Sequence, residues 1–178
     1  MSKKILSQPH PEVGPIVSSS HLVAPGAEEL SEFEFGLIIA NNAFERWMVR
    51  CMIAIGIADL NALDVLVLHT INHRGREKRL ADICLVLNVE DTHTVTYAIK
   101  KLSRAELVSG RKSGKEKQFS TTKKGQKACQ DYRQIRDACL VGSFGASELP
   151  NEKIGDLAEI LRALSGLYDQ ASRAATSL

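Results

Sequence analysis

Several features of enzymes and membrane proteins are missing from this chain of 178 residues. Aromatic residues make up only 5% of it, and no apolar run approaches the roughly 20 residues that a membrane-spanning helix needs. We find no phosphate-binding glycine loop, no nucleophile motif and no acidic pair of known catalytic spacing. The start Met1–Lys4 is not followed by an apolar segment of the kind a signal peptide carries. We therefore expect a cytoplasmic protein that is not an enzyme, holds no cofactor and does not enter a membrane.

Cysteine is sparse, and no Cys-x-x-Cys pair is present. Each cysteine falls on or near the apolar face of a predicted helix, which favours free, buried thiols in a reducing compartment. A redox-sensing cysteine is the alternative that the sequence leaves open. The four residues are Cys51, Cys84, Cys129 and Cys139.

Metal-binding patterns are also lacking. His69 and His73 are four residues apart, so both could lie on one face of a helix. Zinc needs three or four ligands, and no nearby cysteine or carboxylate has a spacing that completes the set. We therefore expect ordinary packing and surface histidines and no metal site.

What the chain does have is positive charge gathered in one stretch. Between Arg74 and Lys127 there are fourteen Lys and Arg residues against six Asp and Glu, a balance of +8. The remaining residues carry nine basic and fifteen acidic side chains, a balance of −6, so the whole chain has a net charge of +2. Such a concentration of charge in one segment is suited to binding a polyanion.

The two ends of the chain differ from this middle. Residues 1–27 are rich in proline and lack apolar periodicity, which predicts a flexible arm. From Glu28, apolar residues recur at three- and four-residue steps, which predicts a long amphipathic helix that ends near Gly56. A helix near the C-terminus has the spacing of a coiled-coil seam, which is typical of a helix with a partner. We expect residues 28–57 and 126–178 to form a helical dimerisation region.

Residues 58–125 predict a winged helix-turn-helix within a mainly α fold. Asp59 suits the N-cap of a first helix that closes at Gly75. Apolar spacing then predicts two short helices, one over residues 80–87 and one that Asp91 caps, which together form a helix-turn-helix. Short strands at 107–109 and 118–121 flank a basic loop, 110–117, and so predict a hairpin that serves as the wing.

The side chains facing out from the last short helix and from the hairpin are candidates for binding DNA. Thr hydroxyls and the Tyr ring can reach base edges or phosphates, and Lys and Arg can bind phosphate. A solvated helix face and a mobile soluble hairpin are the alternatives. The candidates are His93, Thr94, Thr96, Tyr97, Lys100 and Lys101 on the helix and Arg111, Lys112, Lys115 and Lys117 in the hairpin, with Lys78, Arg79, Arg104, Lys123 and Lys124 as further phosphate contacts.

Two of these segments resemble those of a known family. Residues 93–102, followed by Leu107-Val108, are similar to the recognition helix and next strand of the MarR family of winged helix-turn-helix repressors, and residues 122–125 resemble the signature that ends its wing. The chain departs from the family where Glu106 replaces a glycine, where Ser113-Gly114-Lys115 replaces Asp-x-Arg, and where Tyr97 replaces a basic residue. The missing glycine predicts a turn of another geometry after the recognition helix.

The resemblance implies a homodimer on a pseudo-palindromic duplex DNA operator, acting as a repressor or dual regulator, with Lys115 at the wing tip in the minor groove. It also implies a small phenolic or aromatic carboxylate effector bound between the dimerisation region and the winged domain. Trp47, Cys51, His69 and Thr70 are the expected lining, with plain core as the alternative. A winged helix that binds only a protein partner, and a ligand-independent architectural DNA-binding protein, are alternative functions.

Overall fold

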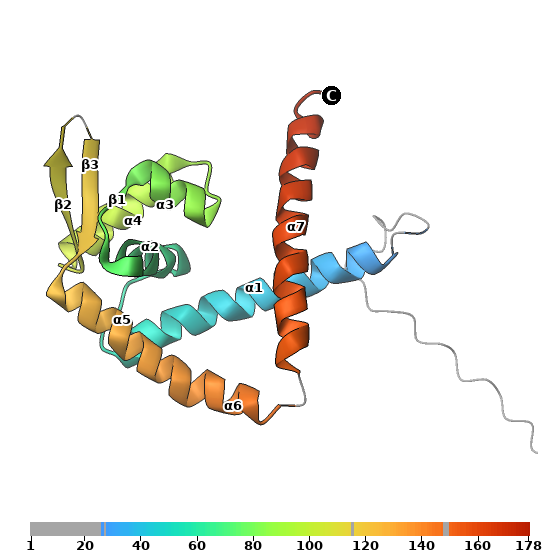
Figure 1. Cartoon of the computed structure of the whole chain (residues 1–178), viewed down its shortest axis with the longest axis horizontal. Helices are drawn as coiled ribbons and strands as arrows, with labels where there is room; N and C mark the ends of the chain where they lie inside the picture. The colour runs from blue at the N-terminus through green and yellow to red at the C-terminus, as the bar shows by residue number, and fades with distance from the viewer. Residues whose placement is uncertain (1–25, 27, 115, 148–149) are drawn as a thin grey trace, which may run out of the picture. The chain divides into compact units, whose positions relative to one another are not determined.

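The computed structural model describes residues 26, 28–114, 116–147 and 150–178 (Figure 1). The flexible arm predicted over residues 1–27 lies, apart from Gly26, outside the described residues. The chain divides into two compact units, one up to Ala128 and one from Cys129 onward. Within the described part, no helix is both long and apolar enough to cross a membrane.

The first unit contains the predicted helices and hairpin, and the mainly α fold with a small sheet is confirmed. One short strand, β1, was not predicted. The elements in chain order are α1 (Glu28–Ala54), α2 (Ala62–Asn72), the 3-10 turn η2 (His73–Gly75), β1 (Lys78–Arg79), α3 (Leu80–Leu87), α4 (Thr92–Arg104), β2 (Val108–Ser113), β3 (Glu116–Thr121) and the first residues of α5 (Lys123–Arg136).

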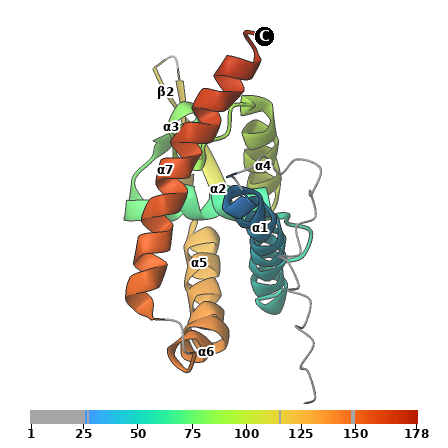
Figure 2. The same ribbon diagram turned by 90° about the vertical axis from the view of Figure 1, so that its right-hand side faces the viewer.

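The core of this unit lies where α4 packs against α2 and α3 (Figure 2). Val95 and Leu102 of α4 are fully buried, as are Leu68 of α2 and Ile83 of α3. The i, i+3, i+4, i+7 spacing of the apolar residues in α4 places them on one stripe of the helix. Burial of that stripe leaves the opposite stripe of α4 in solvent.

The start of α2 differs from the prediction. Asn61, and not Asp59, caps the helix: the Asn61 side chain accepts a hydrogen bond from the Asp64 amide at 2.9 Å, and the Asp64 carboxylate accepts one from the Asn61 amide at 2.9 Å. This reciprocal capping box satisfies two amides at once. Asp59 instead has a left-handed backbone, with φ of 65°. Asp91 caps α4 as predicted, through a 2.8 Å bond from the His93 amide.

Helices α1, α3 and α4 all end on a left-handed residue, respectively Gly56, Asn88 and Glu106, with φ of 81°, 52° and 62°. After α4, the amide of Leu107 donates to the carbonyl of Leu102 at 2.9 Å, which is the bond of a Schellman turn. The prediction of another geometry at this turn is therefore wrong. Glu106 adopts the conformation that glycine favours, although this costs a residue with a Cβ about 1 kcal/mol.

The wing is longer and more regular than predicted. Strands pair in the order β1-β3-β2, all antiparallel, and the β2–β3 register runs from Val108 opposite Thr121 to Ser113 opposite Glu116. The segment 110–117 is therefore mostly strand and not loop. Charged residues and Gly110 favour a loop in sequence, but a two-stranded ribbon with little to cover it also accepts polar side chains on both faces.

In the second unit the helical path of α5 continues beyond Arg136. It passes through a π-helical turn, η3 (Asp137–Val141), and into α6 (Gly142–Gly145). The long helix α7 (Asn151–Ala175) follows. None of its residues is buried, and the exposed apolar side chains of α7 include Ile154, Leu157, Ile160 and Leu167.

Candidate nucleic-acid interface

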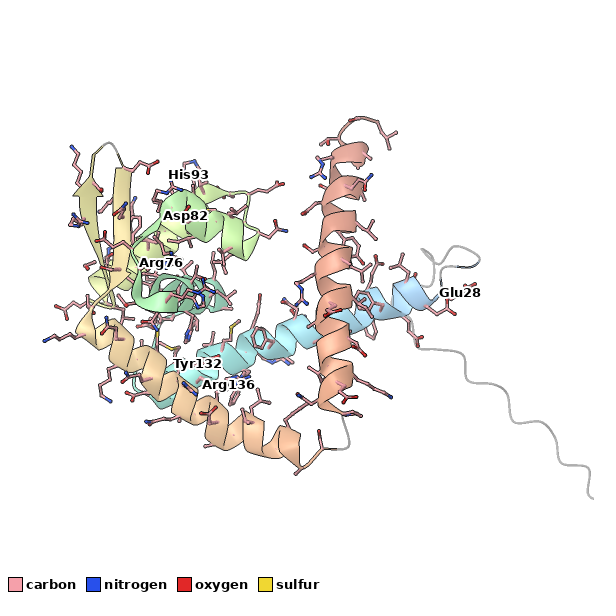
Figure 3. All side chains as sticks on the ribbon, viewed as in Figure 1. Glu28, Arg76, Asp82, His93, Tyr132 and Arg136 are labelled. Carbon is pink, nitrogen blue, oxygen red and sulfur yellow. The ribbon has the colours of Figure 1, made fainter. Side chains whose placement is uncertain are left out.

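The exposed stripe of α4 is the centre of the candidate interface. His93, Tyr97, Lys100 and Arg104 follow each other at steps of four, three and four residues, so they lie along one face opposite the buried stripe. All four are exposed, and Tyr97 has 62% of its surface accessible. His93, labelled in Figure 3, stands at the start of the helix. We call these four residues the α4 ridge.

The two threonines predicted as readers already use their hydroxyl protons. Thr94 donates to the carbonyl of Asp91 at 2.7 Å, and Thr96 donates to the carbonyl of Thr92 at 2.8 Å. Each hydroxyl oxygen can still accept a hydrogen bond. In this arrangement Thr94 and Thr96 could accept from the amino groups of cytosine or adenine, and they could not donate to a phosphate.

A groove of about 660 Å³ separates α4 from the wing. Its floor is apolar, with Ile99 of α4 and Phe119 of β3, and Thr96 and Lys100 stand on the α4 side. The wing side carries Lys117, whose ammonium lies 5.6 Å from the centre of the Phe119 ring. Helix α4 and the wing thus form two walls that both carry cations, an arrangement suited to a phosphate backbone.

Lys101 departs from the predicted exposed face. Its ammonium donates to the carboxylate of Asp64 on α2 at 2.8 Å, and only 29% of the Lys101 side chain is exposed. Asp64 is 1% exposed and is the only charged residue buried in the described part of the chain. Asp64 was not among the predicted site residues, although its place three residues after Asn61 is the spacing of a capping box.

Ion pairs attach the wing to the segment before α3. Arg111 of β2 binds Glu77 through two bonds, Nε to Oε1 at 3.1 Å and Nη2 to Oε2 at 2.7 Å. The hydrogen bond and charge of Arg111 lower the pKa of Glu77, and Glu77 raises the pKa of Arg111. Arg79 bridges Asp82 of α3 at 2.8 Å and Glu116 of β3 at 3.6 Å. These contacts hold the wing in a chain that lacks the Asp-x-Arg of the MarR wing.

The other predicted cations of the wing have different surroundings. Lys112 is exposed and stands directly opposite Lys117 in the β2–β3 register. Two like charges at such a position repel each other unless an anion lies nearby. Lys115, the predicted wing-tip cation, lies outside the described residues.

The segment that resembles the end of the MarR wing is a structural joint. The Thr122 hydroxyl donates to the carbonyl of Glu106 at 2.6 Å and accepts from the amide of Gly125 at 3.0 Å. A Cβ at position 125 would overlap the carbonyl of Leu107, so only glycine fits there. The Lys124 ammonium binds the carbonyl of Ala105 at 2.9 Å. The segment therefore ties the end of α4 to the start of α5.

Two lysines predicted to bind phosphate are thus engaged within the protein. Besides Lys124, Lys78 donates to the carbonyls of His73 and Arg76 at 2.8 and 2.9 Å. Lys123, by contrast, is exposed. Lys78 is engaged because two backbone carbonyls, in and next to η2, accept its hydrogen bonds. The spacing of apolar residues in the sequence gives no sign of such acceptors.

The four residues predicted to line an effector site lie on α1 and α2. Cys51 is fully buried, and Thr70 is half-buried. Burial lowers the pKa of His69, which favours a neutral imidazole. The indole N–H of Trp47 is buried, and no acceptor in the described part of the chain reaches it. The binding of an effector by these four residues remains a prediction.

The cysteines fall into two groups. Cys51, Cys84 and Cys129 are buried, and burial raises the pKa of Cys129 to about 11, which keeps it a thiol. Cys139 is exposed, so the prediction of a buried thiol is wrong at this position. Among the described residues, no group of three or more histidine, cysteine or acidic side chains could hold a metal ion.

Residues 60–125 match the family model of winged helix DNA-binding domains. No curated protein sequence matches this chain. Among solved structures, it is similar to a MarR-family transcriptional regulator from Rhodococcus sp. RHA1, with 14% identity, a TM-score of 0.63 and coverage of 76% of this chain and 93% of the other.

Two further structures are similar. CouR from Rhodococcus jostii RHA1, bound to p-coumaroyl-CoA, has 14% identity and a TM-score of 0.62, with 74% of this chain and 90% of the other covered. Reduced AbfR of Staphylococcus epidermidis, bound to DNA, has 17% identity and a TM-score of 0.62, with 79% and 93% covered. At these identities the likeness concerns the fold. The chain therefore carries a winged helix domain of the DNA-binding type on the fold of the MarR-family transcriptional regulators.

Proposed function

We propose that this chain is a MarR-family regulator of transcription that binds a pseudo-palindromic duplex operator as a homodimer. It acts as a repressor or dual regulator, and a small aromatic ligand modulates it. The observation that carries the proposal is the α4 ridge, where His93, Tyr97, Lys100 and Arg104 stand exposed beside the cationic wing. Neutral and aromatic side chains can contact base edges there, and the cations can bind the flanking phosphates.

Exposed apolar side chains on two long helices support a homodimer. Leu30, Leu37 and Phe44 of α1 recur every seven residues and are each more than a third exposed. Helix α7 has the apolar side chains in solvent described above. Apolar faces of this length are typical of helices that pack against a partner. A two-fold dimer would present two α4 ridges to the two halves of an operator.

The ligand-bound relatives support an effector. One structure of similar fold holds p-coumaroyl-CoA, and another, MarR of Staphylococcus aureus, holds salicylate and kanamycin. In this chain, Trp47 and His69 supply an aromatic surface and a neutral imidazole, which suit an aromatic carboxylate. The buried indole N–H of Trp47 would donate to its carboxylate or phenolic oxygen.

Selection of duplexes from a random pool tests the proposal. The wild-type protein should enrich one sequence, and the logarithm of its affinity should fall linearly with the logarithm of salt concentration. Tyr97→Ala should reduce discrimination between the selected and a shuffled duplex about tenfold, since a good base contact contributes about 1–3 kcal/mol. Lys123→Ala should weaken both duplexes alike, and Lys153→Ala on α7 should change neither.

Other results would point to the alternative functions. Absence of salt-sensitive duplex binding would contradict the proposal and favour a protein partner. Sequence-selective binding that salicylate and p-coumarate leave unchanged would count against the effector and favour a ligand-independent architectural role. If Tyr97→Ala lowered the affinity for both duplexes equally, Tyr97 would not contribute to sequence recognition.

A further inference from the structure

We infer that Asp64 is a positioning residue for DNA recognition: through Lys101, it fixes the rotation and placement of the α4 ridge. This inference rests on the proposed function. Asp64 belongs to α2 and is 1% exposed, so it cannot touch DNA itself. Its effect on recognition must pass through the residue that it holds on α4, which is Lys101.

One oxygen of the Asp64 carboxylate accepts two hydrogen bonds. This oxygen, Oδ2, accepts from the Asn61 amide at 2.9 Å and from the Lys101 ammonium at 2.8 Å. The first bond fixes the carboxylate to the start of α2, and the second connects it to a residue 37 positions later. Because Asp64 is the third residue of α2, the positive end of the helix dipole also favours the carboxylate at this place.

The other carboxylate oxygen makes this pair an unfavourable source of stability. Asp64 Oδ1 is buried, and no donor among the described residues reaches it. A buried ion pair contributes little net stability compared with apolar residues of similar volume, and an unsatisfied oxygen makes it less favourable still. The best-attested use of such buried pairs is to select one arrangement of neighbouring elements.

The surroundings explain why α4 needs this connection. A hollow of about 390 Å³ lies beside the pair, bounded by Asn61 and Asp64 from the α2 side and by His93 and Tyr97 from α4. The buried stripe of α4 packs against α2 on the inner side, whereas on this flank the hollow lies between the two elements. Both ridge residues lie on the hollow, at eight and four residues before Lys101 on the same side of the helix.

A small rotation of α4 into the hollow would move the ridge. Direct contacts with base edges require side chains placed within about 0.5 Å and 10–20° of the productive geometry. Contacts with phosphate tolerate more displacement, because they rest on charge more than on direction. Loss of the pair should therefore reduce discrimination between sequences and leave the general affinity for duplex DNA nearly unchanged.

The double variant Asp64→Asn/Lys101→Met tests this inference. It removes one charge of each sign, so the net charge of the protein is unchanged, and the carboxamide oxygen that replaces the carboxylate can still accept from the Asn61 amide. The probes are the duplex that the wild-type protein selects from a random pool and a shuffled duplex of the same length. We expect discrimination to fall at least tenfold, with affinity for the shuffled duplex within about twofold of wild type.

A matched control is available on the second unit. Arg133 and Asp137 form an exposed ion pair at 3.7 Å within the second unit, so Arg133→Met/Asp137→Asn removes the same charges without a change to α2 or α4. Discrimination in this variant should equal that of wild type. Lys101→Arg keeps the charge and the donors and should retain discrimination within about threefold. If the Asp64–Lys101 pair had a purely structural role, the double variant would change stability and leave the ratio of the two affinities intact.

The outcomes separate the inference from the proposed function. Wild-type protein that binds no duplex would overturn both. Wild-type protein that discriminates, together with a folded double variant that discriminates equally well, would overturn the positioning role alone. If the double variant does not fold, Asp64→Asn alone replaces it, because it leaves no unpaired carboxylate in the core and Lys101 keeps 29% of its side chain exposed. A tenfold loss of discrimination in that folded protein supports the inference, and an unchanged ratio overturns it.

Discussion

The recognition helix and the wing are both attached to the rest of the winged domain by ion pairs, but the two attachments differ in their access to water. The Asp64–Lys101 pair of α4 is buried on the acidic side and largely covered on the basic side. The Arg111–Glu77 pair of the wing is open to solvent, with 68% of the Arg111 side chain exposed. Salt and competing anions reach the second pair far more easily than the first.

This difference suggests a division of labour. A buried pair cannot exchange partners without leaving a charge in the core, so it fixes one position of α4. An exposed guanidinium can leave Glu77 for a phosphate, which accepts the same two parallel hydrogen bonds. In the proposed regulator, α4 would have the same position before and after DNA binding, whereas the side chains of the wing would rearrange to contact the phosphate backbone of the DNA.

Loss of one partner from the buried pair should have the largest effect. Lys101→Met leaves the Asp64 carboxylate buried without its cation, and it should lower the free energy of unfolding by about 3 kcal/mol. Asp64→Asn/Lys101→Met should recover most of this loss, because neither charge then remains in the core. Urea denaturation followed by circular dichroism measures both. Equal stability of Lys101→Met and wild type would mean that water reaches Asp64, and the contrast with the wing would disappear.

Loss of one partner from the Arg111–Glu77 pair should change DNA affinity and not stability. Glu77→Gln removes the internal competitor for Arg111, so duplex affinity should rise by about threefold to tenfold at low salt. Arg111→Gln should lower affinity and reduce the slope of log affinity against log salt by about 0.9, the value for one lost phosphate contact.

The stability of either wing variant should stay close to that of wild type, since exposed ion pairs contribute little. Fluorescence anisotropy with a labelled duplex, over a series of salt concentrations, gives affinity and slope together. If Glu77→Gln weakened DNA binding, Arg111 would need its partner in place, and the wing would be as fixed as α4.

Much of this architecture could be predicted from the sequence, for a clear reason. Apolar spacing predicted α3 and α4 because each helix buries a stripe such as Val95 to Leu102. Asp91 could be predicted as the N-cap of α4 because capping involves only residues next to it in the sequence. The family resemblance gave the fold, which the comparisons confirm.

What the sequence could not predict depends on contacts between distant residues. Lys101 resembled the neighbouring Lys100, because nothing in the sequence around it shows that the Asp64 carboxylate lies at 2.8 Å from its ammonium. Arg111 and Glu77 are 34 positions apart. The strands of the wing were underestimated for a similar reason: pairing between Lys112 and Lys117 depends on backbone partners, and their side chains favour a loop.

The turn at Glu106, between α4 and the wing, offers the smallest expected effect. Glu106 ends α4 with φ of 62°, and its carbonyl accepts the Thr122 hydroxyl, so the backbone must keep this conformation. Glu106→Gly should therefore raise the free energy of unfolding by about 1 kcal/mol, as a glycine adopts this φ without a Cβ penalty. Asn88→Gly is the matched control at the end of α3, where asparagine already tolerates the same conformation, and it should change stability by less. A Glu106→Gly protein that is less stable than wild type would mean that the exposed ion pair between Lys124 and Glu106, at 3.5 Å, stabilises the fold by more than the backbone strain costs. The turn would then depend on surface charge, as the wing does.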